Sequence, residues 1–406
     1  MHKPLDLIVF GATGFTGRLV AEYLNTTYGV DGSLAWGIAG RNRDKLESVR
    51  DLIGAPSTLP LLVADSADAT SLAALAAQAK VIITTVGPYQ YHGQPLVTAC
   101  AQAGTDYVDL CGEPAWLAAM IPLLDAPARA SGARIVFSCG FDSIPFDLGV
   151  VFLQDEAQRR FGKPLTRVRG RVRVMKGGPS GGTVASILAL FEQMERDPTL
   201  MQTMADPFAL TPGFRGPEQP DDESASYDEK ARSWTSPFIM APINTKNVHR
   251  TNALRGHPWG RDFVYDERMM AGDGAKGQGR AKAQARTSRI QNKLLALAPT
   301  RAFLRRFVLP KPGDGPSAHE RATGCYDILF IGETATGETL RASVTGDRDP
   351  GYGSTSKMIA ESALCLIRDV DRTRTAGGVW TAGSAMGLTL VRRLKAHAGL
   401  RFSIDA

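Results

Sequence analysis

A glycine-rich turn between an apolar run and a helix-like segment restricts the fold more than any other feature of the sequence. The turn reads GATGFTG and directly follows the apolar run 5–10. Glycines at this spacing allow a tight turn and let backbone N–H groups approach a diphosphate at the start of a helix. A tight turn without a ligand is the alternative. We expect a dinucleotide to bind at Gly11, Ala12, Thr13, Gly14, Phe15, Thr16 and Gly17.

Short apolar runs alternate with helix-period segments through the first third of the chain. Such alternation is typical of a parallel sheet built from right-handed crossovers. The predicted strands are 5–10, 34–39, 59–64, 81–86, 107–110 and 134–138. The predicted helices are 15–27, 43–53, 67–79, 94–103 and 115–130. The fold class is therefore α/β, with a Rossmann-type doubly wound sheet as a dinucleotide-binding domain over residues 1–145.

The pattern changes after residue 145, where we expect a second, α+β domain over 146–350. Valine alternates with arginine over 167–174, and 326–333 and 339–345 flank a turn as in a hairpin. These runs predict a mixed or antiparallel sheet. Residues 211–232 lack periodicity and are expected to form a loop. The amphipathic run 354–368 predicts a helix, so 351–406 is expected to be a helical segment that returns toward the first domain.

The end of the second predicted strand favours NADP(H) over NAD(H). An NAD-binding protein would place an acidic residue there, whereas this chain has Gly40 followed by Arg41. A guanidinium can hold the 2′-phosphate with charge-assisted hydrogen bonds; a solvated helix start is the alternative for Arg41. Asp65 could accept a hydrogen bond from the adenine amino group or cap the next helix. The turn after the fourth strand is expected to lie against the nicotinamide through Val86, Gly87 and Pro88.

Four polar residues near the expected cleft are candidates for catalysis. Tyr89 and His92 follow the fourth strand, where a phenol or an imidazole could donate a proton, and packing or cofactor contact is the alternative for each. Asp142 and Ser143 follow the sixth strand and lead into the second domain, where polar groups would meet the substrate. Helix capping is the alternative for this pair.

Two further stretches could contact the substrate. A glycine-rich turn precedes the apolar helix predicted at 184–194, and the first N–H groups of a helix can bind an anion. Its substrate-binding candidates are Ser180, Gly181, Gly182 and Thr183, with a tight turn and a threonine cap as the alternative. The arginines of 167–173 form either a solvated face or a basic wall of the substrate site.

The positive charge of the chain is concentrated in one segment. The whole chain has 47 basic and 41 acidic residues, but 276–311 holds ten basic and no acidic residues, which leaves 37 against 41, or −4, for the rest. This pattern argues against a nucleic-acid binder and for a local partner of 276–311. Such a basic amphipathic helix would suit an acidic acyl carrier domain or an anionic membrane surface, with a solvated helix as the alternative.

Cysteine usage and hydropathy indicate a cytoplasmic protein, with peripheral membrane association as the alternative. The five cysteines form no C-x-x-C pair and have no zinc spacing, so no metal site is expected. No stretch reaches the roughly 18 uninterrupted apolar residues of a membrane-spanning helix. The oligomeric state stays open, with a homodimer as one option.

Several longer strings resemble those of the saccharopine dehydrogenase-like oxidoreductases, and most closely the trans-acting enoyl reductases among them. The matching strings are FGATGFTG at 10–17, AGR at 39–41, TTVGPY at 84–89, GTDYVDLCGE at 104–113, GFDSIPFD at 140–147, SGGT at 180–183, LPKPGDGPS at 309–317 and DPGY at 349–352. The resemblance implies an NADP-binding Rossmann domain joined to a second α/β domain, with the active cleft between them. Residues 214–232 and 276–293 match weakly.

The resemblance and the residues together predict an NADP-dependent oxidoreductase. The expected reaction is reduction of the C=C bond of an enoyl or related unsaturated acyl substrate, small or carrier-bound, by an enzyme that acts in trans. A saccharopine-type dehydrogenase acting on a C–N bond is the first alternative. A non-catalytic NADP-binding scaffold at lipid surfaces is the second.

Overall fold

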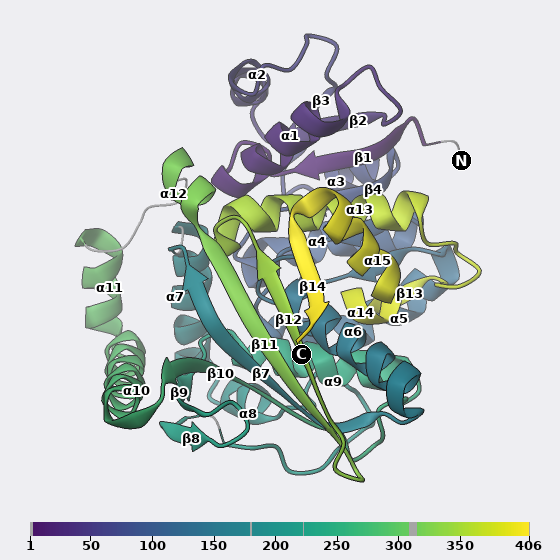
Figure 1. The fold of residues 1–406 in the computed structure, drawn as a ribbon. Helices are drawn as coiled ribbons and strands as arrows, with labels where there is room; N and C mark the ends of the chain where they lie inside the picture. Colours follow the sequence, from purple (N-terminus) through teal and green to yellow (C-terminus); the bar gives the residue numbers. More distant parts are fainter. Residues whose placement is uncertain (1–2, 179–180, 222, 308–314, 406) are drawn as a thin grey trace.

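Two seven-stranded sheets make up the framework of the protein in a computed structural model (Figure 1). The structure describes residues 3–178, 181–221, 223–307 and 315–405. The first sheet lies toward the top of Figure 1 and the second below it. One buried apolar cluster joins the two sheets and includes Val9, Phe146 and Val172. The division of the chain at 145 and 350 therefore stays a prediction.

The first sheet is parallel throughout and confirms the predicted Rossmann-type fold. Its order is β13-β6-β5-β4-β1-β2-β3. The six predicted strands are present as β1 (Leu5–Phe10), β2 (Trp36–Gly40), β3 (Leu61–Val63), β4 (Ala79–Thr84), β5 (Asp106–Val108) and β6 (Arg134–Val136). The apolar residues of the inner strands are mostly buried on both faces because helices cover both sides of the sheet, whereas Val63 of the edge strand β3 is 56% exposed.

Five helices connect these strands. They are α1 (Phe15–Tyr28), α2 (Arg43–Leu52), α3 (Ala69–Ala76), α4 (Tyr89–Ala103) and α5 (Pro114–Ser131). The prediction placed the start of α4 at residue 94. The helix begins five residues earlier, and Pro95 lies inside it. The first two N–H groups of α4 bond to a carboxylate from another segment, a contact that no local pattern reveals.

The second sheet is mixed, as predicted, and its order is β14-β12-β11-β7-β10-β9-β8. The central strand β7 (Leu165–Lys176) pairs antiparallel with β11 (Cys325–Thr334) and parallel with β10 (Val264–Gly272). The predicted hairpin is formed by β11 and β12 (Thr339–Gly346). The remaining strands are β8 (Ser226–Asp228), β9 (Ser233–Pro237) and β14 (Leu400–Ile404). The predicted loop 211–232 thus contains one short edge strand, too short to show an alternating pattern.

Helices of the second half pack on and beside this sheet. They are α6 (Ile144–Phe161), α7 (Gly181–Arg196), α8 (Leu200–Ala205), α9 (Ala241–Leu254), α10 (Gly274–Ala296), α11 (Ala298–Phe307) and α12 (Ala318–Thr323). α6 packs on β11, where a Cβ at Gly149 would lie 2.4 Å from the Phe330 ring. α10 and α11 lie at the outer edge of the molecule, at the left of Figure 1.

The chain end returns to the first sheet, but it is not purely helical as predicted. It begins with a π-helical turn at Pro350–Ser354 and the predicted helix α13 (Thr355–Arg368). β13 (Gly378–Trp380) then adds a seventh strand beside β6, and β14 joins the second sheet. α14 (Ala382–Ala385), α15 (Gly387–Arg393) and a π-helical turn at Leu394–Ala398 lie between them. The three residues of β13 are recognisable as a strand only once β6 offers a free edge.

Within the described residues, no helix has both the length and the apolar character needed to cross a membrane.

Candidate functional site

The glycine turn after β1 leaves space for a ligand at the start of α1. Gly11 has φ +88°, and a Cβ on it would lie 2.6 Å from the Val86 side chain. A Cβ on Gly17 would lie 2.2 Å from the Gly11 carbonyl oxygen, so the helix can approach the turn only with glycine there. Thr13 and Gly14 are exposed at its outer side. The turn therefore fits a diphosphate bound by backbone N–H groups.

No side chain of the described residues caps the start of α1. Gly14 is the N-cap residue and has no side chain to bond the first N–H groups, and the first turn contains no acidic residue. Ala12 is buried, whereas Phe15 and Thr16 are partly exposed beside the turn. The positive end of the helix is thus available to an anion.

Arg41 lies beside this turn. A Cβ on Gly40 would lie 3.6 Å from the Thr13 side chain, so the end of β2 borders the glycine turn. Arg41 is exposed and forms no hydrogen bond or ion pair within the described part of the chain. Arg43 instead pairs with Glu47 at 3.2 Å. Contact of Arg41 with a 2′-phosphate stays a prediction.

Asp65 does not cap α3, so one of its two predicted roles is wrong. The N-cap residue is Asp68, whose side chain accepts from the Thr70 N–H. Asp65 accepts from the Ala67 N–H at 3.0 Å and so holds the turn between β3 and α3. Contact with the adenine stays a prediction.

The turn after β4 leads into a buried carboxylate that sequence reasoning did not select. Val86, Gly87 and Pro88 are partly or fully exposed, and α4 begins directly after them. Glu113 accepts from the N–H groups of Tyr89 (3.0 Å) and Gln90 (2.8 Å). In the sequence, only the position of Glu113 directly after the GTDYVDLCG string could have pointed to it.

Glu113 also links α7 to the start of α4. The Ser186 hydroxyl of α7 donates to its Oε1 at 2.8 Å. Burial raises the pKa of the Glu113 carboxyl, although the three hydrogen bonds oppose the shift. Glu113 therefore occupies the start of α4 and holds α7 against it.

Tyr89 and His92 lie in different environments. The Tyr89 hydroxyl donates to the Thr84 carbonyl at 3.2 Å and accepts from the Leu110 N–H at 3.0 Å. Burial raises the pKa of this phenol well above its usual value. His92 is exposed, with its ring 6.4 Å from that of Tyr91. The contacts of Tyr89 favour a structural role, and its role as proton donor stays a prediction.

Asp142 and Ser143 also differ. Ser143 is the N-cap residue of α6, but its hydroxyl does not cap the helix. It accepts from the Asn247 amide at 2.8 Å and donates to Asn244 at 3.3 Å. Asp142 is partly exposed, and its carboxylate forms no hydrogen bond with the described residues. Burial alone raises its pKa to about 6.

The second glycine-rich turn leads straight into α7, whose first turn contains Gly181, Gly182 and Thr183. Ser180 lies outside the described residues. The Thr183 hydroxyl lies 3.3 Å from that of Tyr352 in the DPGY string. The Tyr352 ring packs edge-on against Phe15 of the first glycine turn, with centroids 5.2 Å apart. The structure thus brings both glycine turns together through Tyr352.

The arginine face of β7 is part of an ion-pair network and not an open wall. Arg171 lies 2.6 Å from Asp228 and 2.9 Å from Asp266. The other pairs are Arg167 with Asp266, Arg169 with Glu333, and Arg173 with Asp327. Each guanidinium of this strand is therefore neutralised within the sheet, which removes it as a binding site for substrate carboxylates.

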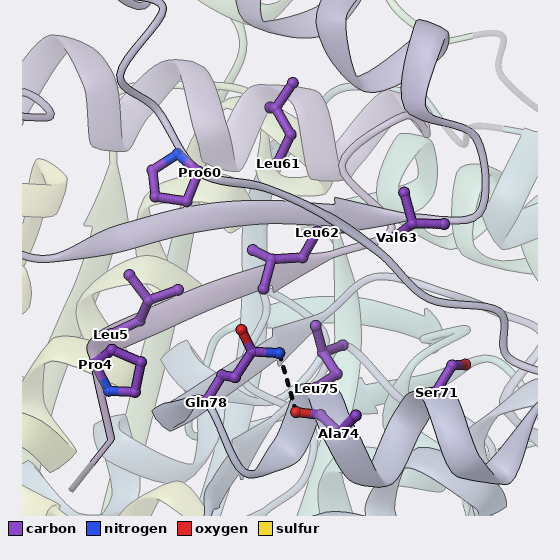
Figure 2. Close-up of a pocket in the computed structure, with 10 residues that line it drawn as sticks. All are labelled: Pro4, Leu5, Pro60, Leu61, Leu62, Val63, Ser71, Ala74, Leu75 and Gln78. Carbon is purple, nitrogen blue, oxygen red and sulfur yellow. Dashed lines mark hydrogen bonds between the residues drawn. The ribbon is translucent and has the colours of Figure 1, made fainter.

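A cavity lies away from the candidate site, and the described residues offer no metal-binding cluster. A cavity of about 530 Å³ lies between β3, α3 and the start of β1 (Figure 2). Its lining includes Leu5, Leu62 and Gln78 and none of the predicted catalytic, cofactor-binding or substrate-binding residues. Within the described part of the chain, no group of three or more His, Cys, Asp or Glu side chains could hold a metal ion.

Comparisons with known proteins agree with this geometry. Residues 7–136 match the family model of the saccharopine dehydrogenase NADP binding domain. This segment includes the glycine turn and Arg41. It is therefore an NADP-binding domain, and NADP(H) is the cofactor.

Full-length relatives and one solved structure extend the comparison. A Mycobacterium tuberculosis protein named as a candidate trans-acting enoyl reductase is 41% identical over 97% of this chain and 96% of its own. The trans-acting enoyl reductase of Mycobacterium ulcerans is 36% identical with the same coverage. The yeast saccharopine dehydrogenase (L-Glu forming) aligns over 99% of this chain and 100% of its own, with a TM-score of 0.53 and 12% identity. That likeness shows the fold alone.

Proposed function

The chain belongs to the family of trans-acting enoyl reductases, and on this premise we propose that it uses NADPH to reduce the C=C bond of an unsaturated acyl group presented by a separate partner protein. The observation that carries the proposal is the glycine turn with Arg41 beside it, a side chain that has no partner among the described residues. When bound, NADPH supplies a hydride to one carbon of the double bond. The protein must orient both molecules and supply a proton to the other carbon.

Asp142 is the group that best fits the role of proton donor. It follows β6, and parallel strands end at one edge of the sheet, so the ends of β4 and β6 lie ~10 Å apart across β5. Its pKa of about 6 leaves part of the carboxyl protonated near neutral pH. It has no competing hydrogen bond among the described residues. Tyr89, in contrast, is bonded to main chain on both sides.

Other residues would position the nicotinamide and the acyl substrate. Val86, Gly87 and Pro88 would lie along the nicotinamide, and Glu113 would fix the start of α4 beside them. The first turn of α7, at 181–183, would hold the acyl carbonyl oxygen or a phosphate of the substrate arm. Ser180, His92 and Ser143 stay candidates for contact with the substrate.

The test of the proposed function is the loss of NADPH absorbance with a panel of substrates. The panel contains enoyl thioesters of several chain lengths, saccharopine-type imines and a blank. Turnover of an enoyl thioester is expected. Turnover of the imines alone would replace the proposal with C–N chemistry, although the paired arginines of β7 speak against it. NADPH binding without any turnover would indicate a scaffold.

The role of Asp142 is tested with Asp142→Asn. We expect turnover to fall by about 10²–10⁴-fold, the usual contribution of a positioned acid, while the affinity for NADPH is kept. In the unmodified protein, turnover should decrease as the pH rises above about 6, because the acid form of the carboxyl is lost. Equal turnover and an equal pH profile in both proteins would exclude Asp142 as the donor. Asp155→Asn, which changes an exposed carboxylate of α6 outside the candidate site, serves as a control.

A further inference from the structure

The outer helix α10 carries cations that the rest of the protein does not neutralise. We call this group the α10 cations: Lys276, Arg280, Lys282, Arg286, Arg289 and Lys293. All six are exposed, and none forms a hydrogen bond or ion pair within the described part of the chain. The next cation behaves differently, because Arg301 of α11 is buried and pairs with Glu195 of α7. The α10 cations therefore differ from Arg301, whose charge is paired within the fold.

An apolar stripe lies among these cations. Ile290, Leu294 and Leu297 are 47%, 42% and 57% exposed. Their spacing of four and three residues places them along one line of the helix and its end. At about 100° per residue, the α10 cations fall on both sides of this line. Large exposed apolar side chains rimmed by charge mark an interaction surface.

The opposite face of α10 explains why the stripe points outward. The buried residues of this helix are Gly277, Ala281 and Ala285. A Cβ on Gly277 would lie 1.9 Å from the Gly272 carbonyl oxygen, so the helix start packs tightly on β10. α10 also packs along β9, where Gln284 accepts from the Ser236 hydroxyl at 2.8 Å. The helix is thus anchored by its small residues, and the stripe has no part in that anchoring.

We propose that α10 and Leu297 form the docking surface for an acidic, helical domain of the partner that carries the acyl substrate. This inference rests on the proposed function. An acidic helix with its own apolar face would cover the stripe and place carboxylates beside the α10 cations. Outside 276–311 the chain has a net charge of −4. A broad anionic surface, such as a membrane, would therefore also approach the acidic rest of the protein and be repelled by it. A compact domain would touch only α10, which favours a protein over a membrane.

The position of α10 relative to the cofactor site fits the delivery of a tethered substrate. α7 packs against α10, and Glu195 near its end pairs with Arg301. The other end of α7 lies at Tyr352 and Phe15, beside the cofactor turn. The sixteen residues of α7 rise ~24 Å. A flexible arm from a domain docked on α10 would follow α7 to reach the cleft.

The experiment compares a carrier-bound with an untethered substrate. The probe is an acyl carrier protein with a phosphopantetheine arm, charged with the enoyl group that gives the highest turnover in the panel. The same enoyl group as an N-acetylcysteamine thioester is the untethered substrate. The double variant Arg289→Glu with Lys293→Glu is compared with the matched control Arg392→Glu with Lys395→Glu, which reverses two exposed charges elsewhere.

The α10 variant is expected to raise the KM for the carrier-bound substrate by about tenfold or more, because it removes attraction and adds repulsion. Its kinetics with the untethered thioester, and both activities of the control, should stay unchanged. Leu294→Ser should raise the same KM without altering its dependence on salt. No turnover of either the untethered or the carrier-bound substrate by the unmodified protein would refute the proposed function, and equal affinities of the unmodified protein and the α10 variant for the carrier protein would refute the docking surface.

Two results would overturn the docking proposal. In the first, the carrier-bound substrate has the same KM with the α10 variant as with the unmodified protein. In the second, the unmodified protein floats with phosphatidylglycerol vesicles and the α10 variant does not, while both proteins have the same kinetics with the carrier-bound substrate. That second result would assign α10 to an anionic membrane surface.

Discussion

Two arginine-rich stretches of this protein look alike in sequence and differ completely in the structure. In β7, every arginine of the 167–173 run faces a carboxylate from a neighbouring strand. In α10, six cations lie on the surface without a partner among the described residues. Charge that is paired inside the fold stabilises it, whereas charge without a partner is available for recognition. The number of basic residues therefore says little about function until their neighbours are known.

The strongest test of this contrast removes the central pair of β7. Arg171→Ala would leave the carboxylates of Asp228 and Asp266 buried without their main cation. We expect a loss of about 3–5 kcal/mol in the free energy of unfolding, because an uncompensated buried charge is costly. Denaturant unfolding measures this loss. A loss below about 1 kcal/mol, the range of exposed pairs, would contradict the structural role of the network.

Arg41 provides the next test, because it is unpaired like the α10 cations but lies at the cofactor turn. Arg41→Ala should weaken NADPH binding by about tenfold to hundredfold and leave NADH binding nearly unchanged. Its free energy of unfolding should not change. Arg43→Ala is the matched control, because Arg43 already pairs with Glu47. Calorimetry with both dinucleotides measures the ratio of their affinities. An unchanged ratio of NADPH to NADH affinity would show that Arg41 does not recognise the 2′-phosphate.

A smaller, graded effect is expected on acidification. Burial alone would raise the pKa of Asp266, but Arg171 and Arg167 lower it below its usual value. The pKa of Asp228 is lowered in the same way by Arg171. A carboxyl with a lower pKa in the folded state stabilises the protein above the unfolded pKa, so stability should decline as the pH falls below about 4.

The measurement is the free energy of unfolding against pH in the unmodified protein and in the variant Asp228→Asn. The variant should be less stable at neutral pH and should lose less stability on acidification. Parallel curves for the two proteins would show that the folded pKa of Asp228 is not lowered.

The smallest effect is expected in α10. Arg286→Ala should change the free energy of unfolding by no more than about 0.5 kcal/mol, because the side chain is exposed and has no partner among the described residues. The same unfolding experiment as for Arg171→Ala gives the direct comparison. A loss above about 1 kcal/mol would show that the α10 cations take part in the fold.

Several features that depend on neighbouring residues were predicted correctly. The strand, glycine turn and helix at 5–28 follow from local steric limits, because only glycine fits at Gly11 and Gly17. The six predicted strands of the first sheet and the β11–β12 hairpin follow from their hydrophobic patterns. The NADP preference followed from the missing acidic residue after β2. These properties are local, so a single sequence contains them.

Features that join distant segments were decided only by the tertiary structure. Glu113 and Ser186 lie 73 positions apart, and Arg171 and Asp228 lie 57 apart. β13 is a strand only because β6 has a free edge beside it. The sequence by itself determined where the cofactor turn is and which residues carry charge. Packing and strand register decided which charges meet a partner, because these contacts depend on how distant segments come together and not on the pattern within either one.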